Sequence, residues 1–171
     1  MKTLLTITAL LAFAVPAATA QSTSPAQLCK EQLRTMGAAS FQSTYGSNGN
    51  GRNAMGKCVS RQRQVVSQST ENAAKKCKAE RGTTAASQAA FADKYGTNPN
   101  KRNAFGKCVS GQAKETTEAQ QEATLNAAKT CKAERGTTAE SRTAFQNKYG
   151  TNANKRNAFG KCVSQNAKKT A

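Results

Sequence analysis

The chain has 171 residues, with 26 lysines and arginines against nine acidic residues, a formal charge of +17. It contains no histidine, so the commonest general base of enzymes and the usual imidazole ligand of metal ions are absent. This composition argues against an enzyme and against a cofactor or metal site, whereas the excess of positive charge favours contact with anionic surfaces or polymers.

The first 20 residues are typical of a secretory signal peptide. Lys2 is followed by a predominantly apolar run, residues 4–15, and Ala18 and Ala20 match a small-residue cleavage site. The run is shorter than the ~20 residues that a membrane span needs. We expect export of the protein and a disordered leader at residues 21–25. An ordinary N-terminal core helix is the alternative.

Three copies of one motif make up most of the remaining chain. KYGTNANKRNAFGKCVS at residues 148–164 recurs as KYGTNPNKRNAFGKCVS and, with more changes, as TYGSNGNGRNAMGKCVS, and each copy has a second cysteine upstream. Such recurrence is typical of a repeat protein. We divide the chain, in order, into repeat one, a linker, repeat two, a linker, repeat three and a basic tail: residues 26–60, 61–71, 72–110, 111–125, 126–164 and 165–171.

Each repeat is predicted to contain three helical pieces, most clearly in repeat three. Residues 125–136 are rich in helix-forming Ala, Lys and Glu and end in glycine. Thr137 is expected to cap the second helix, with Glu140 completing a capping box, and Gly150 ends that helix. Asn157 is expected to cap the third helix, whose Phe159, Cys162 and Val163 fall on one face.

The linkers contain no proline and differ in length by about one helical turn. Nineteen residues separate Cys58 from Cys77, and 23 separate Cys108 from Cys131. A continuous helix tolerates an insertion of four residues with little change of phase. The fold class is therefore predicted to be all-α, with three tandem disulfide-stapled repeats joined by connecting helices. A flexible Gln- and Thr-rich linker is the alternative, because polar helices are marginal alone.

Six cysteines in an exported protein are most simply interpreted as three disulfides. The separations within repeats, 29, 31 and 31 residues, vary less than those across the linkers. We therefore expect each disulfide to close one repeat, which gives the pairs Cys29–Cys58, Cys77–Cys108 and Cys131–Cys162. The alternative pairs Cys58–Cys77 and Cys108–Cys131 would force each linker into a hairpin. Because each repeat has few large apolar side chains, this crosslink is expected to be decisive for its stability.

The Asn-rich segment before the second cysteine is the best candidate for binding an anion. Asn103 and Asn157 would each open a helix, whose free backbone N–H groups attract anions. Basic residues flank both asparagines, namely Lys101, Arg102, Lys107, Lys155, Arg156 and Lys161. The alternative is that the asparagines only cap helices and the cations only solubilise the surface. Repeat one is a weaker candidate for anion binding, because Gly51 replaces the lysine and only Arg52 remains.

Other chemistry is disfavoured. Glu80 and Glu134 recur in the string CKAERG, where a surface ion pair with Arg81 or Arg135 is a simpler interpretation than catalysis. No catalytic residue is predicted. Calcium is disfavoured because no carboxylate accompanies the loop asparagines and two cations lie among them.

The repeated string resembles one in secreted bacterial proteins that carry one or more such cysteine-flanked repeats and have no established function. The resemblance covers all three repeats and implies export and a repeat architecture, with no activity, cofactor or site. Repeat one departs most, at Ser47, Gly49, Gly51 and Met55.

The expected function is non-enzymatic binding of an anionic polymer through weak multivalent contacts. The partner would be a cell-wall polymer, a nucleic acid or an anionic lipid surface. Few aromatic side chains remain to stack on bases, which weakens the case for nucleic acid. Any binding of nucleic acid is expected to be independent of sequence and sensitive to salt. The helices lack the wide apolar face of a membrane-lytic helix. A structural spacer associated with the cell envelope and a small inhibitor or toxin-like effector are the alternatives.

Overall fold

The structure is a computed structural model that describes residues 24–170, and within this range all regular structure is α-helical. Seven helices follow one another: α1 (Pro25–Met36), α2 (Ala38–Tyr45), α3 (Ala54–Arg81), α4 (Ala85–Tyr95), α5 (Ala104–Arg135), α6 (Ala139–Tyr149) and α7 (Ala158–Thr170). The predicted all-α class is confirmed. The predicted signal peptide and residues 21–23 of the predicted leader lie outside the described residues.

The first helix begins inside the segment expected to be a leader. The Ser24 hydroxyl accepts a hydrogen bond from the Gln27 backbone N–H at 3.3 Å, and the Gln27 side chain accepts one from the Ser24 N–H at 3.0 Å. Pro25 occupies the first turn, where a missing N–H has no cost. This capping box explains why α1 begins at residue 25.

The predicted connecting helices are confirmed. Helix α3 spans 28 residues and carries Cys58 near its start and Cys77 near its end, and α5 spans 32 residues and carries Cys108 and Cys131 in the same way. Each linker is therefore the middle of one unbroken helix. The predicted basic tail is also helical up to Thr170, as the end of α7.

All three predicted disulfides are present. They join Cys29 to Cys58, Cys77 to Cys108 and Cys131 to Cys162, with Cα–Cα distances of 6.0, 6.1 and 6.0 Å. Each one ties the helix before the aromatic helix of a repeat to the helix after it. The aromatic helices α2, α4 and α6 each end on a tyrosine that lies about one turn from a phenylalanine, with ring centroids 5.0, 4.8 and 4.9 Å apart.

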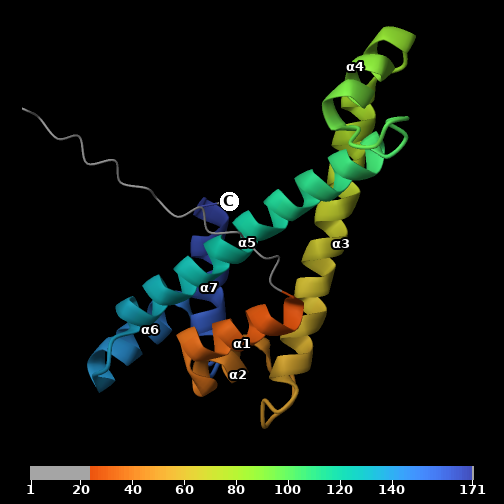
Figure 1. Cartoon of the computed structure of the whole chain (residues 1–171). Helices are drawn as coiled ribbons and strands as arrows, with labels where there is room; N and C mark the ends of the chain where they lie inside the picture. Colours follow the sequence, from red (N-terminus) through yellow and green to blue (C-terminus); the bar gives the residue numbers. More distant parts are fainter. Residues whose placement is uncertain (1–23, 171) are drawn as a thin grey trace, which may run out of the picture.

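The two longest helices, α3 and α5, form two legs, with repeat two at the end where they meet (Figure 1). Helices α3 and α5 lie together near α4 and diverge toward the opposite end, where the helices of repeats one and three gather. Helix α1 contacts both legs, and α2 packs against α7. Repeats one and three, which are far apart in sequence, are therefore neighbours in space.

The core is divided in the same way. One cluster of buried residues combines repeats one and three and includes Phe41, Phe145, Phe159 and Val163. Repeat two has its own small cluster, in which the buried residues are Cys77, Phe91, Ala104 and Cys108. Repeat two is consequently the part of the molecule that depends most on its own disulfide.

One cap differs from the prediction. Thr138, not Thr137, caps α6, and its hydroxyl accepts a hydrogen bond from the Ser141 backbone N–H at 3.2 Å. Thr84 caps α4 in the same way through Ser87. Because Gly136 has a positive φ of 63°, the chain turns before the threonine pair and places the second threonine at the cap.

Candidate functional site

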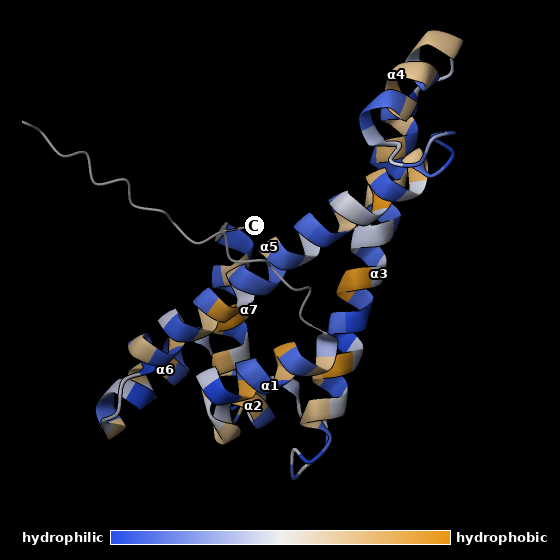
Figure 2. Cartoon of the chain, in the orientation of Figure 1, coloured by the Kyte–Doolittle hydropathy of each residue, from blue (hydrophilic) through white to orange (hydrophobic). Residues whose placement is uncertain are grey.

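The three Asn-rich loops follow the aromatic helices and are largely hydrophilic, as Figure 2 shows for those after α2 and α4. Each loop is closed by its last asparagine. The side chain of Asn103 accepts a hydrogen bond from the Thr97 N–H at 3.1 Å and donates one to the Thr97 hydroxyl at 2.6 Å. Asn157 does the same with Thr151, and Asn53 with Ser47.

These contacts correct the predicted role of the asparagines. Asn103 stands at the cap position of α5 without a capping hydrogen bond from its side chain, because the amide instead closes the loop. The Asn157 amide is likewise directed to Thr151 and Asn152. Both residues therefore order the loop, with the amide oxygen and one amide N–H engaged within it.

A second asparagine holds the backbone N–H of the arginine in each loop. The Asn100 side chain accepts a hydrogen bond from the Arg102 backbone N–H at 3.1 Å, and the pairs Asn50–Arg52 and Asn154–Arg156 repeat this contact at the same distance. The three arginines are exposed. One loop backbone geometry thus recurs three times, each time with an exposed arginine at the same position.

The predicted anion-binding lysines Lys101 and Lys155 contact groups of their own repeats. Lys101 and Lys155 adopt left-handed φ values of 54° and 53°, which lysine rarely adopts, and the equivalent residue in repeat one is Gly51 at 66°. The Lys101 ammonium lies 2.6 Å from the Asp93 carboxylate, and the Lys155 ammonium donates to the Gly150 carbonyl at 3.1 Å. These lysines therefore brace their own loops.

The structure brings two of the loops together and keeps the third apart. The loops of repeats one and three border a cleft of about 460 Å³ lined by residues from both. Arg156 and Asn157 of the predicted site lie on this cleft, opposite Asn48 and Asn50 of repeat one. The loop of repeat two, with Lys101, Arg102, Asn103 and Lys107, is at the other end of the legs (Figure 1).

The contribution of repeat one was missed by the sequence prediction. Asn48 and Asn50 border the cleft only because α2 packs against α7, a contact between distant parts of the chain. No local sequence signal reports that contact. The remaining predicted cations, Lys107 and Lys161, are exposed on the first turns of α5 and α7.

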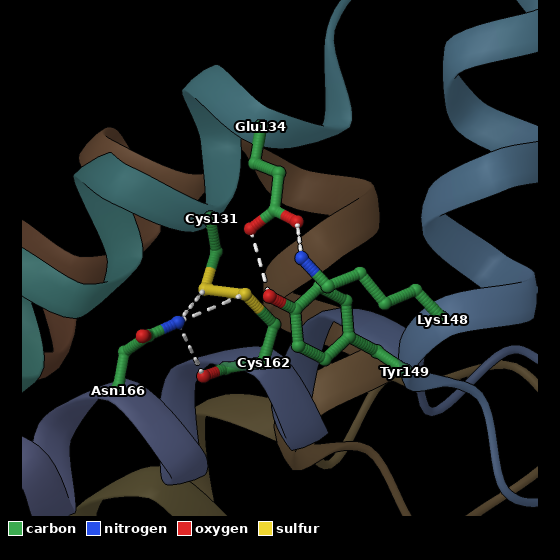
Figure 3. Close-up of polar contacts among 6 residues, drawn as sticks. All are labelled: Cys131, Glu134, Lys148, Tyr149, Cys162 and Asn166. Carbon is green, nitrogen blue, oxygen red and sulfur yellow. Dashed lines mark hydrogen bonds and ion pairs between the residues drawn. A yellow bond between two sulfur atoms is a disulfide. The ribbon is translucent and has the colours of Figure 1, made fainter.

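The recurring glutamates form ion pairs with lysine, so the predicted arginine partner is wrong. Glu134 accepts from the Lys148 ammonium at 2.5 Å and from the Tyr149 hydroxyl at 2.8 Å (Figure 3). Glu80 makes the same contacts with Lys94 and Tyr95. The lysine hydrogen bond is the main cause that lowers the pKa of each glutamate from 4.5, and it raises the pKa of each lysine.

The arginines of the CKAERG strings stack on aromatic rings instead. The Arg81 guanidinium lies 5.6 Å from the centre of the Phe105 ring, and that of Arg135 lies 5.3 Å from Phe159. Arg135 also donates to the hydroxyl of Ser40, which belongs to repeat one. This contact helps to join repeats one and three.

Repeat one replaces the charged pair by a neutral one. Gln32 occupies the position of Glu80 and Glu134, is fully buried, and accepts a hydrogen bond from the Tyr45 hydroxyl at 2.5 Å. Burial raises the pKa of Tyr45, whereas the nearby Arg61 lowers it. A neutral amide suits this position because a carboxylate buried without a cation is costly.

The disulfide of repeat three is covered by a polar side chain from α7. The Asn166 amide donates to the Cys162 carbonyl at 3.2 Å and lies 3.5 and 3.4 Å from the sulfurs of Cys131 and Cys162 (Figure 3). All six cysteines are paired. A disulfide sulfur is not a nucleophile, so the arrangement is structural.

Residues 24–170 contain no group of three or more cysteine or acidic side chains placed to hold a metal ion. Within the same range, no helix has the length and apolar character required to cross a membrane. No protein-family model, no curated protein and no solved structure matches the chain. The helices and the cysteine pairs define the class as an all-α protein with three disulfides.

Proposed function

We propose that the protein is a secreted, non-enzymatic binding protein for anionic polymers of the cell surface, and that the Asn-rich loops carry the binding. Three disulfides are consistent with an oxidising, extracellular location. The net charge of +17 favours anionic partners in general. Among the basic surfaces, the loops are the proposed binding sites because all three share one geometry.

The observation that carries the proposal is a loop backbone geometry that recurs three times and places an exposed arginine at the same position each time. Each arginine is exposed and follows an asparagine that fixes its backbone N–H, so the loop is ordered before any ligand arrives. An ordered loop loses less conformational entropy on binding. Guanidinium groups also suit the planar, bidentate recognition of phosphate, sulfate and carboxylate.

The spacing of the loops supports a polymer as the ligand. Arg52 and Arg156 belong to the two loops that border the cleft, whereas Arg102 lies at the other end of the legs. Helix α5 spans 32 residues, or about 48 Å at 1.5 Å per residue. A small ligand would contact one of these sites, whereas a chain of repeating anionic groups would contact several and gain avidity.

The test compares two variants of equal charge. The loop variant changes Arg102, Lys107, Arg156 and Lys161 to Gln, which leaves the bracing lysines in place. The control changes four exposed cations elsewhere, Lys30, Arg63, Lys76 and Lys169, to Gln. Both are measured against duplex DNA, an anionic polysaccharide and anionic liposomes over a salt series.

We expect the loop variant to lose at least tenfold in affinity for the preferred polymer, and the control less than threefold. For DNA, loss of four phosphate contacts would also lower the slope of log K against log salt by about 3 to 4. Equal losses in both variants would refute the loops as the binding site.

A structural spacer is the second candidate, and the long helices favour it. Helices α3 and α5 hold repeat two away from the core of repeats one and three. Equal and weak binding by both variants, without saturation, would favour this role.

A further inference from the structure

A second kind of basic surface lies where the long helices end, at the opposite end of α4 and α6 from the loops. The α3-end hollow, of about 590 Å³, and the α5-end hollow, of about 630 Å³, occupy equivalent positions in repeats two and three. The first is lined by Lys75, Lys78, Ala79, Arg81, Gly82, Thr83 and Gln88. The second is lined by Thr35, Lys129, Lys132, Ala133, Arg135, Gly136, Thr137 and Arg142.

The α5-end hollow collects four cations and no carboxylate in its lining. Lys129, Lys132 and Arg142 are exposed, and their side chains have no ion pair or hydrogen bond within residues 24–170. Of the nearest acids in sequence, Glu134 is paired with Lys148 and Tyr149, and Glu140 forms no ion pair with a cation of the hollow within residues 24–170. Three of the four cations of this hollow therefore have no acidic partner among the described residues.

The α3-end hollow can be compared with the α5-end hollow residue by residue. Two differences make its positive charge weaker. Lys75, the equivalent of Lys129, is paired with Glu71 at 2.8 Å, and the residue at the position of Glu71 in repeat three is Leu125. Gln88 occupies the position of Arg142. The α5-end hollow thus has one more cation and lacks the acid that pairs with the first lysine.

Stabilisation of a helix end does not account for all of these cations. Lys132 and Arg135 lie in the last turn of α5, where positive charge is favourable. Lys129 lies earlier in the helix and Arg142 belongs to α6, so neither is explained by the α5 terminus. Thr35 of repeat one and Thr137 add hydroxyl donors on the rim.

We propose that the α5-end hollow binds a compact, doubly charged oxyanion, namely a phosphate or sulfate group. Three unpaired cations converging on one hollow suit an anion that accepts several charge-assisted hydrogen bonds. The oxyanion is either free in solution or an ester on a polymer. The inference does not depend on the loops, because the loop of repeat three follows Tyr149 at the far end of α6, seven residues or about 10 Å beyond Arg142.

The experiment titrates the oxidised protein with inorganic phosphate, sulfate and polyphosphate at constant ionic strength, and follows backbone amide shifts by NMR. We expect saturable shifts at Gly136, Thr137 and Arg142. Arg142→Gln, which copies the α3-end hollow, should weaken binding at least fivefold, and Arg63→Gln, which removes one exposed cation from α3, less than twofold. Tighter binding of polyphosphate than of inorganic phosphate would identify a polymer as the source of the group.

A gain of binding provides the complementary test. The double variant Glu71→Gln, Gln88→Arg converts the α3-end hollow to the charge pattern of the α5-end hollow and should create a second saturable site with shifts near Gly82. Equal effects of Arg142→Gln and Arg63→Gln, or shifts that grow linearly without saturation, would overturn the inference. The loop variant should retain this binding, so failure of one proposal is distinguishable from failure of the other.

Discussion

The same seven residues, AFGKCVS, open helices α5 and α7, yet they meet different surroundings. In α7, Phe159 and Val163 are each 4% exposed, because α2 of repeat one covers this face. In α5, the equivalent Phe105 and Val109 are only partly buried and border a groove of about 750 Å³ between the two legs. Identical sequence therefore gives a shared core in one repeat and an open apolar face in the other.

A small side chain on α2 lies at the contact between α2 and α7. Thr44 lies against Gly160 of α7, and the residues equivalent to Thr44 in the other aromatic helices are Lys94 and Lys148. Each lysine instead pairs with a glutamate of its own repeat. A short side chain permits close approach of the two helices, so repeat one is suited to cover a neighbour and repeats two and three are not.

Replacement of the two equivalent phenylalanines by alanine is the strongest test of the comparison. Phe159→Ala removes a buried ring from the shared core and should lower the free energy of unfolding by about 3–5 kcal/mol. Phe105→Ala removes a partly exposed ring and should cost about 1–2 kcal/mol. Denaturant unfolding with far-UV circular dichroism measures both, and similar losses would show that α2 does not protect the face of α7.

Much of this fold could be predicted from local patterns, because the cysteine spacing, the glycine stops and the linker length act within one repeat. The disulfide pairs and the continuous helices follow from those patterns and are confirmed. The association of repeat one with repeat three was not predicted. It depends on single differences such as Thr44 in place of lysine, whose effect appears only when two helices meet.

The candidate site was predicted only in part, for a related reason. The string NKRN indicated a basic loop, but the asparagine amides have two possible uses, capping a helix or closing the loop, and composition does not decide between them. The threonine or serine six residues earlier decides the outcome, because it offers the amide both a backbone N–H and a hydroxyl. The partner of Glu80 was wrong because Lys94 lies 14 residues away, on the next helix.

The two equivalent glycines, Gly106 and Gly160, provide a second test of the comparison. The expected change in stability is smaller than for the phenylalanines, and at Gly106 it is a gain. A Cβ at Gly106 would have no heavy atom within 4 Å, so Gly106→Ala should stabilise the protein by about 0.5–1 kcal/mol through helix propensity. A Cβ at Gly160 would lie 3.3 Å from the Thr44 Cα, so Gly160→Ala must displace α2 and should destabilise the protein or leave it unchanged.

Gly111, which also has open space on α5, provides the control for the glycine pair, and Gly111→Ala should resemble Gly106→Ala. Thermal unfolding followed by circular dichroism would rank the three variants. A gain at Gly160 equal to that at Gly106 would show that the two faces are equally open in solution.

The acid dependence of stability should be the smallest effect and, unlike the others, should be the same in both repeats. The hydrogen bonds from Lys94 and Lys148 lower the pKa of Glu80 and Glu134 in the folded protein. A lowered pKa means that the stabilisation is complete above the ordinary carboxyl value of 4.5 and is lost as the pH falls through the folded value. Glu80→Gln and Glu134→Gln should each flatten the decline of stability below about pH 4.5.

Urea unfolding at pH 7, 4 and 3 measures this dependence, with Glu122→Gln, at an exposed position on α5, as the control. The side chains of Glu80 and Glu134 are 34% and 32% exposed, so the two variants should change the pH dependence equally. A larger change for Glu134→Gln would mean that the shared core also strengthens the ion pair of repeat three. Equal changes would mean that polar contacts within a repeat are reproduced from copy to copy, whereas apolar burial depends on which repeat lies alongside.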